Sequence, residues 1–289
     1  KLTWTRDDDL QQDFYRPASY TQFSAGLDAQ GWPVAWTARV VCPSFSGLRN
    51  GVDRTAVEGI AEIYDVPNMY VDYHPPDVGI PVSFWRSVGY SQNTFFTESF
   101  IDEMASAGGK DPVEFRRRLL VKLPRLLGVL NLAAEKAGWG KPLQAGIFRG
   151  VGLSNNIGSF NAQVAEVSVK QGKVRVHRVV CAVDCGHTVN PATIVQQIRG
   201  GIVFGMSAAL RGAITIDRGR VQQSNFHQYE PLRIDEMPVI EVHIMPSQSA
   251  PGGMGESSTP ATAPAIANAV FAATGKRIRQ LPFSNTEFA

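Results

Sequence analysis

The sequence contains few cysteines, and their spacing excludes the common cysteine-based sites. Only Cys42, Cys181 and Cys185 occur in 289 residues, an odd number without the regular spacing of a disulfide framework. The segment Cys-Ala-Val-Asp-Cys-Gly-His at 181–187 is neither a CxxC zinc knuckle nor a CxxCH haem-attachment motif. Because a four-thiolate iron–sulfur cluster cannot be built from three cysteines, an electron carrier of that type would have to lie on a partner chain.

The sequence also lacks a charge excess and a long apolar run. With 28 basic and 26 acidic residues the formal net charge is +2, which gives no electrostatic reason to expect a nucleic-acid partner. The densest basic run, Arg116 to Arg118, is interpreted as a solvated helix face. No apolar run approaches the roughly 20 residues that a membrane-spanning helix needs.

Standard catalytic signatures are missing as well. There is no GxxxxGK[ST] phosphate loop, no HExxH motif and no GxGxxG after a predicted strand. The segment 205–209 resembles a weakened nucleophile elbow around Ser207. A serine hydrolase is therefore a minor hypothesis, since an elbow requires a sharp strand-to-helix turn and this segment lies in a predicted helix.

Hydrophobic periodicity predicts a mixed α+β protein without the βαβ rhythm of a doubly wound sheet. The chain opens abruptly, without an initiator Met or signal peptide, so we expect that a further segment preceded it. Strands are predicted at 1–6, 20–27, 33–41, 163–169, 174–183 and 239–245, with a further hairpin at 211–223. Helices are predicted at 94–107, from Asp111, from Pro124 to Gly138, and at 194–210 and 264–274. The chain is divided into two expected lobes, 1–144 and 145–289.

The segment 251–260 (PGGMGESSTP) is the one most suggestive of chemistry. Three glycines in four positions would let the backbone pass very close to another object. Glu256 follows directly, and Ser-Ser-Thr-Pro is suited to open a helix. A turn carrying a solvated glutamate is the simpler interpretation, and a general base delivered on a glycine arm is the alternative.

Several stretches combine in order along nearly the whole chain. They are 84–92 (FWRSVGYSQ), Asp184-Cys185-Gly186 with Asn190-Pro191, Gln197 and Gly200-Gly201, then 222–227 with 232–238, and Gly253-Met254-Gly255-Glu256 with 263–269 and 274–277. Together they resemble the xanthine dehydrogenase/aldehyde oxidase family, and more narrowly its isoquinoline 1-oxidoreductase β-subunit type. The resemblance implies a two-lobed α+β domain that binds molybdopterin, with the second lobe carrying the catalytic glutamate.

The resemblance also accounts for the abrupt start. Family members carry glycine-rich GQG and GGGFG segments that hold the molybdopterin, and neither occurs in this sequence. The chain is therefore expected to correspond to the C-terminal part of the large subunit, with the N-terminal half as one partner. A small subunit with [2Fe–2S] clusters and a cytochrome c are the other implied partners, and the implied cofactor is molybdenum with molybdopterin as its cytosine dinucleotide.

By resemblance, roles can be assigned to individual residues. Glu256 is implied as the general base that accepts a proton at the molybdenum centre. The residues implied to bind the cofactor are Arg86, Ser87, Val88, Gly89, Gln197, Gly253, Met254 and Gly255. The substrate pocket is expected to include Val88, Leu153, Ser154 and Asn155. No side chain is expected to ligate the metal, which would be held through the pterin dithiolene.

Simpler interpretations exist for several of these residues. Arg86 could form an ordinary surface ion pair, Gln197 could be a helix-surface amide, and 153–155 could be a strand-to-loop junction. Val88 stands where xanthine-oxidising relatives have Phe, and its smaller side chain argues against a purine substrate.

The resulting prediction is a molybdenum hydroxylase subunit. It would oxidise an aldehyde or N-heterocyclic aromatic with water as the oxygen source and pass electrons to a partner chain. The alternative is a non-catalytic scaffold or assembly half of such a complex.

Overall fold

The computed structural model describes residues 1–47 and 51–288, and it confirms the predicted α+β class. The helices are α1 (Arg6–Gln11), α2 (Arg54–Val57), α3 (Tyr90–Ala107), α4 (Pro112–Leu119), α5 (Pro124–Ala137), α6 (Pro191–Leu210), α7 (Thr259–Thr274) and the 3-10 turns η1 (Ile234–Glu236) and η2 (Phe283–Asn285). The strands are β1 (Tyr20–Leu27), β2 (Pro33–Val41), β3 (Asn68–His74), β4 (Phe148–Asn156), β5 (Ser159–Lys170), β6 (Lys173–Asp184), β7 (Ile216–Asp217), β8 (Arg220–Val221) and β9 (Val239–Ile244).

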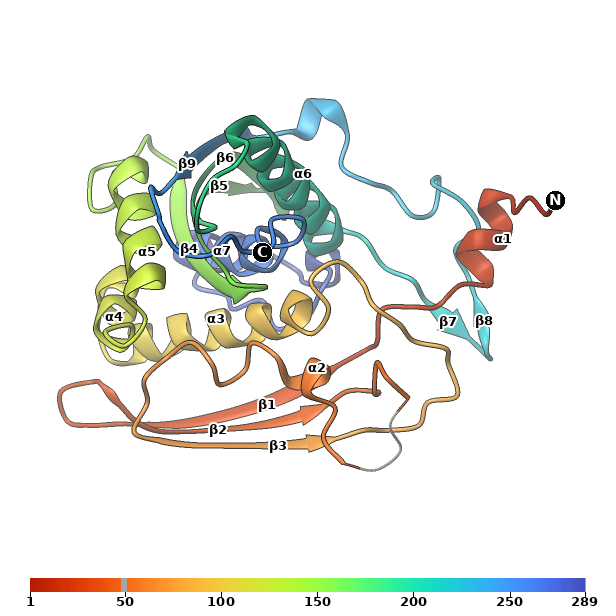
Figure 1. Cartoon of the computed structure of the whole chain (residues 1–289), viewed down its shortest axis with the longest axis horizontal. Coiled ribbons are helices and arrows are strands. Elements are labelled where there is room, and N and C mark those ends of the chain that lie inside the picture. Colours follow the sequence, from red (N-terminus) through yellow and green to blue (C-terminus); the bar gives the residue numbers. More distant parts are fainter. Residues whose placement is uncertain (48–50, 289) are drawn as a thin grey trace.

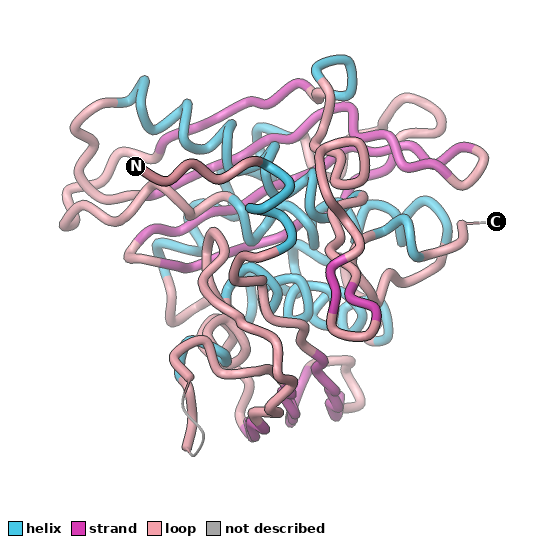
Figure 2. Tube along the Cα trace, turned by 90° about the vertical axis from the view of Figure 1, so that its right-hand side faces the viewer, coloured by secondary structure: helices cyan, strands magenta, loops and turns pink. Residues whose placement is uncertain are grey.

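Two sheets lie on opposite sides of a helical layer that contains α3 and α7 (Figures 1 and 2). One sheet has three strands in the order β1-β2-β3, and the other has four in the order β4-β5-β6-β9. The predicted hairpin at 211–223 is confirmed as the short pair β7 and β8, beside α1 at one end of the molecule (Figure 1). Within the described residues, no helix is long and apolar enough to cross a membrane.

The four-stranded sheet differs from the expectation in one connection. Strands β4, β5 and β6 form an antiparallel meander, whereas β9 pairs with β6 in parallel. Parallel neighbours need a crossover, and the long helix α6 lies within it. The β6-α6-β9 segment is therefore a βαβ-type unit that the sequence pattern did not indicate, because more than 20 residues separate α6 from β9. In the other sheet, β2 and β3 are also parallel, and α2 lies between them in the chain.

The two faces of this sheet carry alternate side chains, as strand geometry requires. Val180 and Ala182 of β6 belong to the hydrophobic cluster that includes α5, whereas Val179 and Cys181 belong to the cluster that includes α6 and α7. The first cluster also joins residues on both sides of position 144. The lobe boundary at 144 therefore remains a prediction.

Three predicted elements are corrected by the structure. Residues 1–5 form no strand, and α1 follows them because Thr5 and Asp8 make a capping box. Helix α7 begins at Thr259 rather than at Pro264, which lies inside it. Helix α3 begins at Tyr90 rather than at Thr94.

Helix α3 is also more polar inside than its sequence suggested. Its buried residues include the whole run from Ser91 to Thr94, whereas the predicted apolar-face residues Phe96 and Phe100 are only partly buried. A buried polar side chain is stable only when its hydrogen bonds are made. Asn93 meets this condition in part, because its side-chain amide donates to the carbonyls of Ala56 and Glu58 at 2.9 and 2.8 Å.

The expectation of a solvated basic face at 116–118 is wrong for Arg116. Its side chain is fully buried and bonds the equally buried Glu98 at 3.0 Å, and Asp102 lies 3.4 Å away. Burial alone would lower the pKa of Arg116, but Glu98, Tyr64 and Asp102 together raise it above its usual value. Three consecutive arginines look equivalent in the sequence, but successive positions of a helix point in different directions. Arg116 can therefore be buried while Arg117 and Arg118 remain more exposed.

Removing this buried cation should destabilise the fold strongly. Replacement of Arg116 by Met leaves the Glu98 carboxylate buried without its cation, which should cost about 3–5 kcal/mol of unfolding free energy. Arg117→Met is the matched control, because Arg117 pairs with the exposed Glu114 and should cost about 0–1 kcal/mol. Urea unfolding of the two purified variants measures the difference, and equal midpoints would contradict a structural role for the buried pair.

Candidate functional site

The segment 249–257, which we call the strap, is anchored at its start by the loop after β6. His187 N–H donates to the Ser249 carbonyl and Gly252 N–H to the Cys185 carbonyl, both at 2.8 Å. Between them, Gly186 has a φ of +74°, and a Cβ there would lie 2.1 Å from the Ala250 carbonyl oxygen. Glycine is therefore required at 186 both for conformation and for space.

The middle of the strap lies against the turn between β4 and β5. A Cβ on Gly252 would lie 2.5 Å from the Gly158 carbonyl oxygen, and one on Gly253 would lie 2.4 Å from Ile157 Cγ2. Gly253 N–H donates to the Ile157 carbonyl at 2.7 Å. These two glycines therefore pack closely against the turn between β4 and β5 of the same chain. The N–H of Gly253 has an acceptor within the chain, which differs from its expected role as a cofactor donor.

The end of the strap is held by the loop before α3. Arg86 Nε donates to the Gly255 carbonyl at 2.7 Å, and its terminal nitrogen bonds the Gln197 Oε1 at 3.1 Å. Ser87 Oγ donates to the Glu256 carbonyl at 2.8 Å. Five residues selected from distant parts of the sequence therefore meet in one place.

The loop that holds the strap has an unusual backbone. Ser87 and Val88 have φ values of +76° and +47°, and such conformations cost on the order of 1–3 kcal/mol each for residues other than glycine. At Gly89 a Cβ would lie 1.8 Å from the Thr55 carbonyl oxygen, so this end of the loop packs directly on α2. The surrounding contacts therefore impose a conformation that the isolated segment would avoid, and it directs Arg86 and Ser87 toward the strap.

Helix α7 continues from the strap, and its start is bonded to α6. Ser258 Oγ donates to the Ile198 carbonyl at 3.1 Å, and Thr259 Oγ1 donates to the Gly201 carbonyl at 3.3 Å. A Cβ on Gly201 would lie 2.1 Å from Ser258 Oγ, and one on Gly205 would lie 2.9 Å from the Thr259 carbonyl oxygen. The glycines of α6 thus permit the close contact that fixes the residues directly after Glu256.

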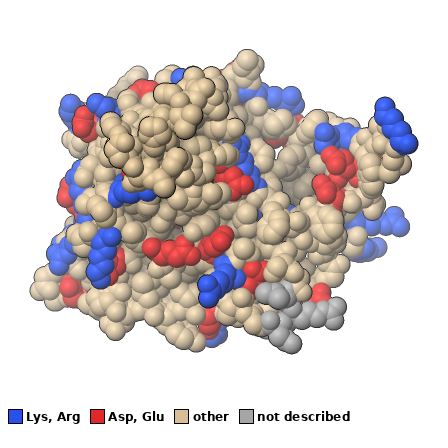
Figure 3. All heavy atoms as spheres, viewed as in Figure 1, with Lys and Arg blue, Asp and Glu red and all other residues tan. Residues whose placement is uncertain are grey.

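The side chains of Glu256, the predicted base, and of Arg86 are only partly buried. Burial lowers the pKa of Arg86, and the negative charge of Glu256 opposes this change. Charged side chains of both signs are interspersed on the face of the molecule seen in Figure 3. The charges of Arg86 and Glu256 therefore influence each other.

The predicted substrate-pocket residues divide into two kinds. Leu153 and Ser154 are completely buried: Leu153 lies in the hydrophobic core, and Ser154 Oγ donates to the Ser257 carbonyl at 2.8 Å. Ser154 therefore holds the strap and Leu153 belongs to the core, so the complete burial of both side chains argues against their predicted place in the substrate-pocket lining. Asn155 and Val88 are partly buried and stay candidates.

The minor serine-hydrolase hypothesis is not supported by the surroundings of Ser207. Its Oγ donates to the Val203 carbonyl and accepts from Leu232 N–H, both at 3.0 Å, in the last turn of α6. Ser207 therefore lies in a regular helix, without the sharp turn of a nucleophile elbow.

Sequence reasoning missed Glu58, whose carboxyl group is affected by the charge of Glu256. It follows α2, and its partly buried side chain packs beside Gly89. Burial and the charges of Glu62, Asp53 and Glu256 raise the pKa of Glu58 to about 7. The only signal in the sequence was a glutamate directly before a glycine, and this pair is too common in proteins to indicate a functional site.

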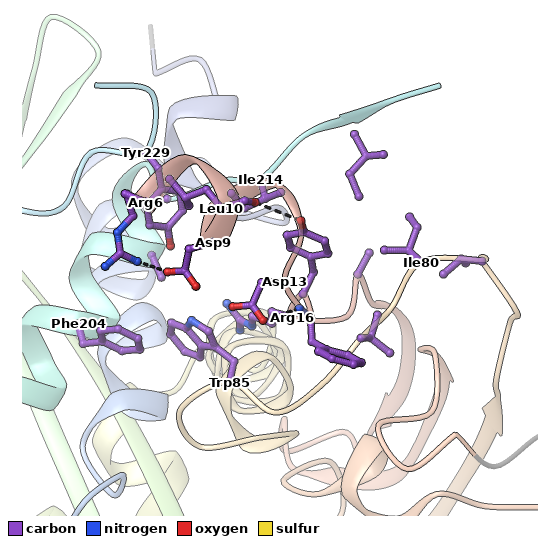
Figure 4. Close-up of a pocket in the computed structure, with 18 residues that line it drawn as sticks. Arg6, Asp9, Leu10, Asp13, Arg16, Ile80, Trp85, Phe204, Ile214 and Tyr229 are labelled. Carbon is purple, nitrogen blue, oxygen red and sulfur yellow. Dashed lines mark hydrogen bonds and ion pairs between the residues drawn. The ribbon is translucent and has the colours of Figure 1, made fainter. Parts of the chain in front are cut away.

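A cavity of about 710 Å³ is lined by Trp85 and Phe204 together with Arg16 and Tyr229 (Figure 4). The rings of Trp85 and Phe204 stack with centroids 4.6 Å apart. Arg16 lies 4.4 Å from the Trp85 ring centroid, and Arg86 lies 5.7 Å from that of Phe204. The two rings thus form part of the wall of this largely apolar cavity, and each has a guanidinium group close to it.

Comparison with known proteins identifies the family. Models described as molybdopterin cofactor-binding domains match residues 1–120 and 129–238. The β-subunit of isoquinoline 1-oxidoreductase from Brevundimonas diminuta is 32% identical over 98% of this chain and 38% of its own length. The chain belongs to the xanthine oxidase family of molybdopterin-binding subunits.

Further members of the family agree with this assignment. A nicotinate dehydrogenase subunit from Pseudomonas putida is 34% identical over 92% of this chain, which covers 25% of that relative. The fold is similar to that of quinoline 2-oxidoreductase from Pseudomonas putida 86, with a TM-score of 0.82 and 14% identity over 96% of this chain and 62% of the other. The chain thus spans well under half the length of these two curated relatives, the isoquinoline and nicotinate enzymes.

The residues around the strap fit the cofactor that this family binds. Gly255 has open space where a Cβ would be, so no contact within the described residues accounts for a glycine there. The described residues likewise provide no acceptor for the N–H groups of Met254, Gly255 and Glu256. Gln197 accepts from Arg86 through its oxygen and lies exposed, which leaves its amide N–H groups available. This donor set suits a pterin ring with its oxygen and nitrogen acceptors.

The contact between α6 and the residues after Glu256 can be tested with two adjacent glycines. Gly201→Ala places a methyl group against Ser258 Oγ and should cost about 1–3 kcal/mol of unfolding free energy. Gly200→Ala, which meets no atom within 4 Å, should leave stability unchanged or raise it by up to about 1 kcal/mol. Thermal unfolding of both variants checks this order, and an equally stable Gly201→Ala protein would show that the contact is not close.

Proposed function

We propose that this chain is the C-terminal part of a molybdenum hydroxylase subunit, with Glu256 as its general base. The proposal rests chiefly on the way the chain holds the strap: the carbonyls of Gly255 and Glu256 are bonded to Arg86 and Ser87, while the Glu256 carboxylate remains partly exposed. A base must be held within hydrogen-bond reach of the proton that it removes. Molybdenum in molybdopterin would supply the two-electron redox centre when bound.

Individual residues would then have separate tasks. Arg86 holds the Gly255 carbonyl and orients Gln197, so its first role is to fix the strap rather than to contact substrate. Gln197 and the backbone N–H groups of Met254 and Gly255 would donate hydrogen bonds to the pterin. Glu256 would accept the proton from water-derived oxygen during substrate oxidation, and Arg86 would stabilise its charged form.

The substrate class is proposed from the relatives. Two of them are named for isoquinoline and nicotinate, and a third for aldehyde. We therefore propose an aldehyde or an N-heterocyclic aromatic as substrate. The side chain of Val88 is small, so this position offers no aromatic ring on which a purine could stack.

The cofactor form and the partners follow from the same proposal. We propose the cytosine dinucleotide form of molybdopterin, with an N-terminal half of the large subunit completing its site. All three cysteines are buried and free, so [2Fe–2S] clusters would be carried by a small subunit, and a cytochrome c could receive the electrons. Metal and nucleotide analysis of the assembled complex checks these assignments.

Replacement of the proposed base should abolish most activity. In the assembled complex, Glu256→Gln keeps the shape of the side chain but cannot accept a proton, so kcat should fall by roughly 100-fold or more. Steady-state oxidation of an aldehyde or N-heterocycle with an artificial electron acceptor measures the effect. The exposed Glu230 provides the charge-matched control, Glu230→Gln, which should retain activity.

Molybdenum and pterin contents distinguish the possible failures. A Glu256→Gln complex with full cofactor content and undiminished turnover would overturn the role of Glu256. A wild-type complex that assembles with its partner but contains neither molybdenum nor pterin would instead favour the scaffold alternative.

A further inference from the structure

We propose that the cavity beside Trp85 is a binding site for a small organic monocarboxylate that carries an apolar ring. Arg16 binds the carboxylate, and the apolar walls of the cavity enclose the ring. The site goes beyond the proposed function, because neither Glu256 nor molybdopterin takes part in it. Its residues come from the N-terminal segment, the loop before α3, the end of α6 and the segment after α6 (Figure 4).

The walls of the cavity are largely apolar and open to a ligand. Ile80, Val82 and Ile214 line it together with the stacked rings of Trp85 and Phe204. Four large apolar side chains of the lining are exposed, namely Phe14, Val78, Phe204 and Ile216. Exposed apolar side chains that gather in one place are typical of a binding site. The volume of about 710 Å³ lies within the range of about 300–1,000 Å³ that small-molecule sites have.

Arg16 gives this cavity a cation without a counter-ion. Its side chain is partly buried, and within the described residues its guanidinium group makes no hydrogen bond and no ion pair. The other arginine of the lining, Arg6, is paired with Asp9. Burial lowers the pKa of Arg16 to about 10, which leaves the side chain charged at neutral pH. A partly buried charge without a partner is unfavourable, so a bound anion would stabilise the site.

The contact between Arg16 and Trp85 leaves the guanidinium group free to bind an anion. The guanidinium carbon lies 4.4 Å from the centroid of the Trp85 ring. A guanidinium group that lies over an aromatic ring still has N–H groups along its edge, and a carboxylate can accept two parallel hydrogen bonds from them. The Trp85 ring thus supports the cation without using its hydrogen-bonding capacity.

Tyr229 supplies a second polar group to the same cavity. Within the described residues, its hydroxyl group makes no hydrogen bond. Burial raises the pKa of Tyr229, and the positive charge of Arg16 opposes this change. The hydroxyl group therefore stays protonated at neutral pH and can donate to a ligand oxygen. A few polar groups in a mostly apolar cavity are the usual means of orienting a small ligand.

The acids of the lining favour a ligand with a single negative charge. Asp9 is paired with Arg6, and Asp13 accepts a hydrogen bond from its neighbour, Phe14 N–H, at 2.7 Å. Two basic and two acidic side chains line the cavity, so the lining has no net charge. A dianion such as phosphate would be repelled by both aspartates, whereas one carboxylate needs only the charge of Arg16.

Three probes test the site on the assembled complex by calorimetry, namely 2-naphthoate, its neutral amide 2-naphthamide, and inorganic phosphate. We expect saturable binding of 2-naphthoate, weaker binding of the amide, and no binding of phosphate. Arg16→Gln should weaken the binding of 2-naphthoate by about 10- to 100-fold, the effect of losing hydrogen bonds to a charged group, and should leave the amide nearly unaffected. Arg16→Lys should restore part of the preference, because it keeps the charge without the bidentate geometry.

Arg6→Gln is the matched control, because Arg6 lines the same cavity but already has Asp9 as its partner. It should change the affinity for 2-naphthoate by about 2-fold or less. Tyr229→Phe should weaken this binding by about 2- to 10-fold, the effect of one neutral hydrogen bond. Ala208→Phe places a ring in the cavity from α6 and should abolish the binding of 2-naphthoate and its amide alike. Thermal unfolding of each variant verifies that it is folded.

Glu256→Gln separates this site from one at the strap, because Glu256 is not part of the cavity lining. It should leave the binding of 2-naphthoate unchanged. An Arg16→Gln complex that binds 2-naphthoate as tightly as the wild type would overturn the inference. A wild-type complex that binds none, because a partner polypeptide fills the cavity, would do the same, as would binding that is lost in Glu256→Gln. Phosphate that binds as tightly as 2-naphthoate would contradict the monocarboxylate assignment. None of these measurements needs turnover, so failure of the proposed base would leave this inference intact.

Discussion

The close approach of α7 to its neighbours is the constraint on which the site depends. On one side, a Cβ on Gly150 or Gly152 of β4 would lie 2.1 or 2.6 Å from backbone atoms of α7, and on another the glycines of α6 leave room for Ser258 and Thr259. Backbones in direct contact have few alternative positions, because no flexible side chain separates them. The start of α7, directly after Glu256, is therefore held between β4 and α6.

This arrangement places polar groups in the interior, where each must find a partner. Among the residues that the structure describes, no strand pairs with the outer edge of β4: Leu153 N–H donates to the Glu98 carboxylate at 3.1 Å, and the Val151 carbonyl accepts from Asn268 at 3.0 Å. Glu98 in turn depends on Arg116. Glu98 and Asn268 thus take the place of a neighbouring strand, and together with Arg116 they join α3, α4 and α7 to the sheet.

The sequence predicted the elements whose signals are local. Alternation indicated β5 and β6, and Gly138 and Gly275 end α5 and α7 in left-handed conformations as expected. The family motifs led to Arg86, Gln197 and Glu256, which the structure brings together. The sequence could not predict the features that depend on distant contacts, namely the buried polar face of α3, the burial of Arg116 and the position of Glu58. These properties arise from tertiary neighbours, and no periodicity within a single segment encodes them.

The strained loop and the bonded strap have a common physical consequence. The conformations at Ser87 and Val88 are unfavourable in isolation, so contacts with α2 and the strap must maintain them. Since Arg86 and Ser87 bond the carbonyls of Gly255 and Glu256, the same hydrogen bonds stabilise both segments. The proposed base, with its backbone held in this way, would lose little further conformational freedom when it reacts, which is the condition under which positioning contributes most to rate. The strain is thus better understood as part of the positioning of Glu256 than as a defect of the loop.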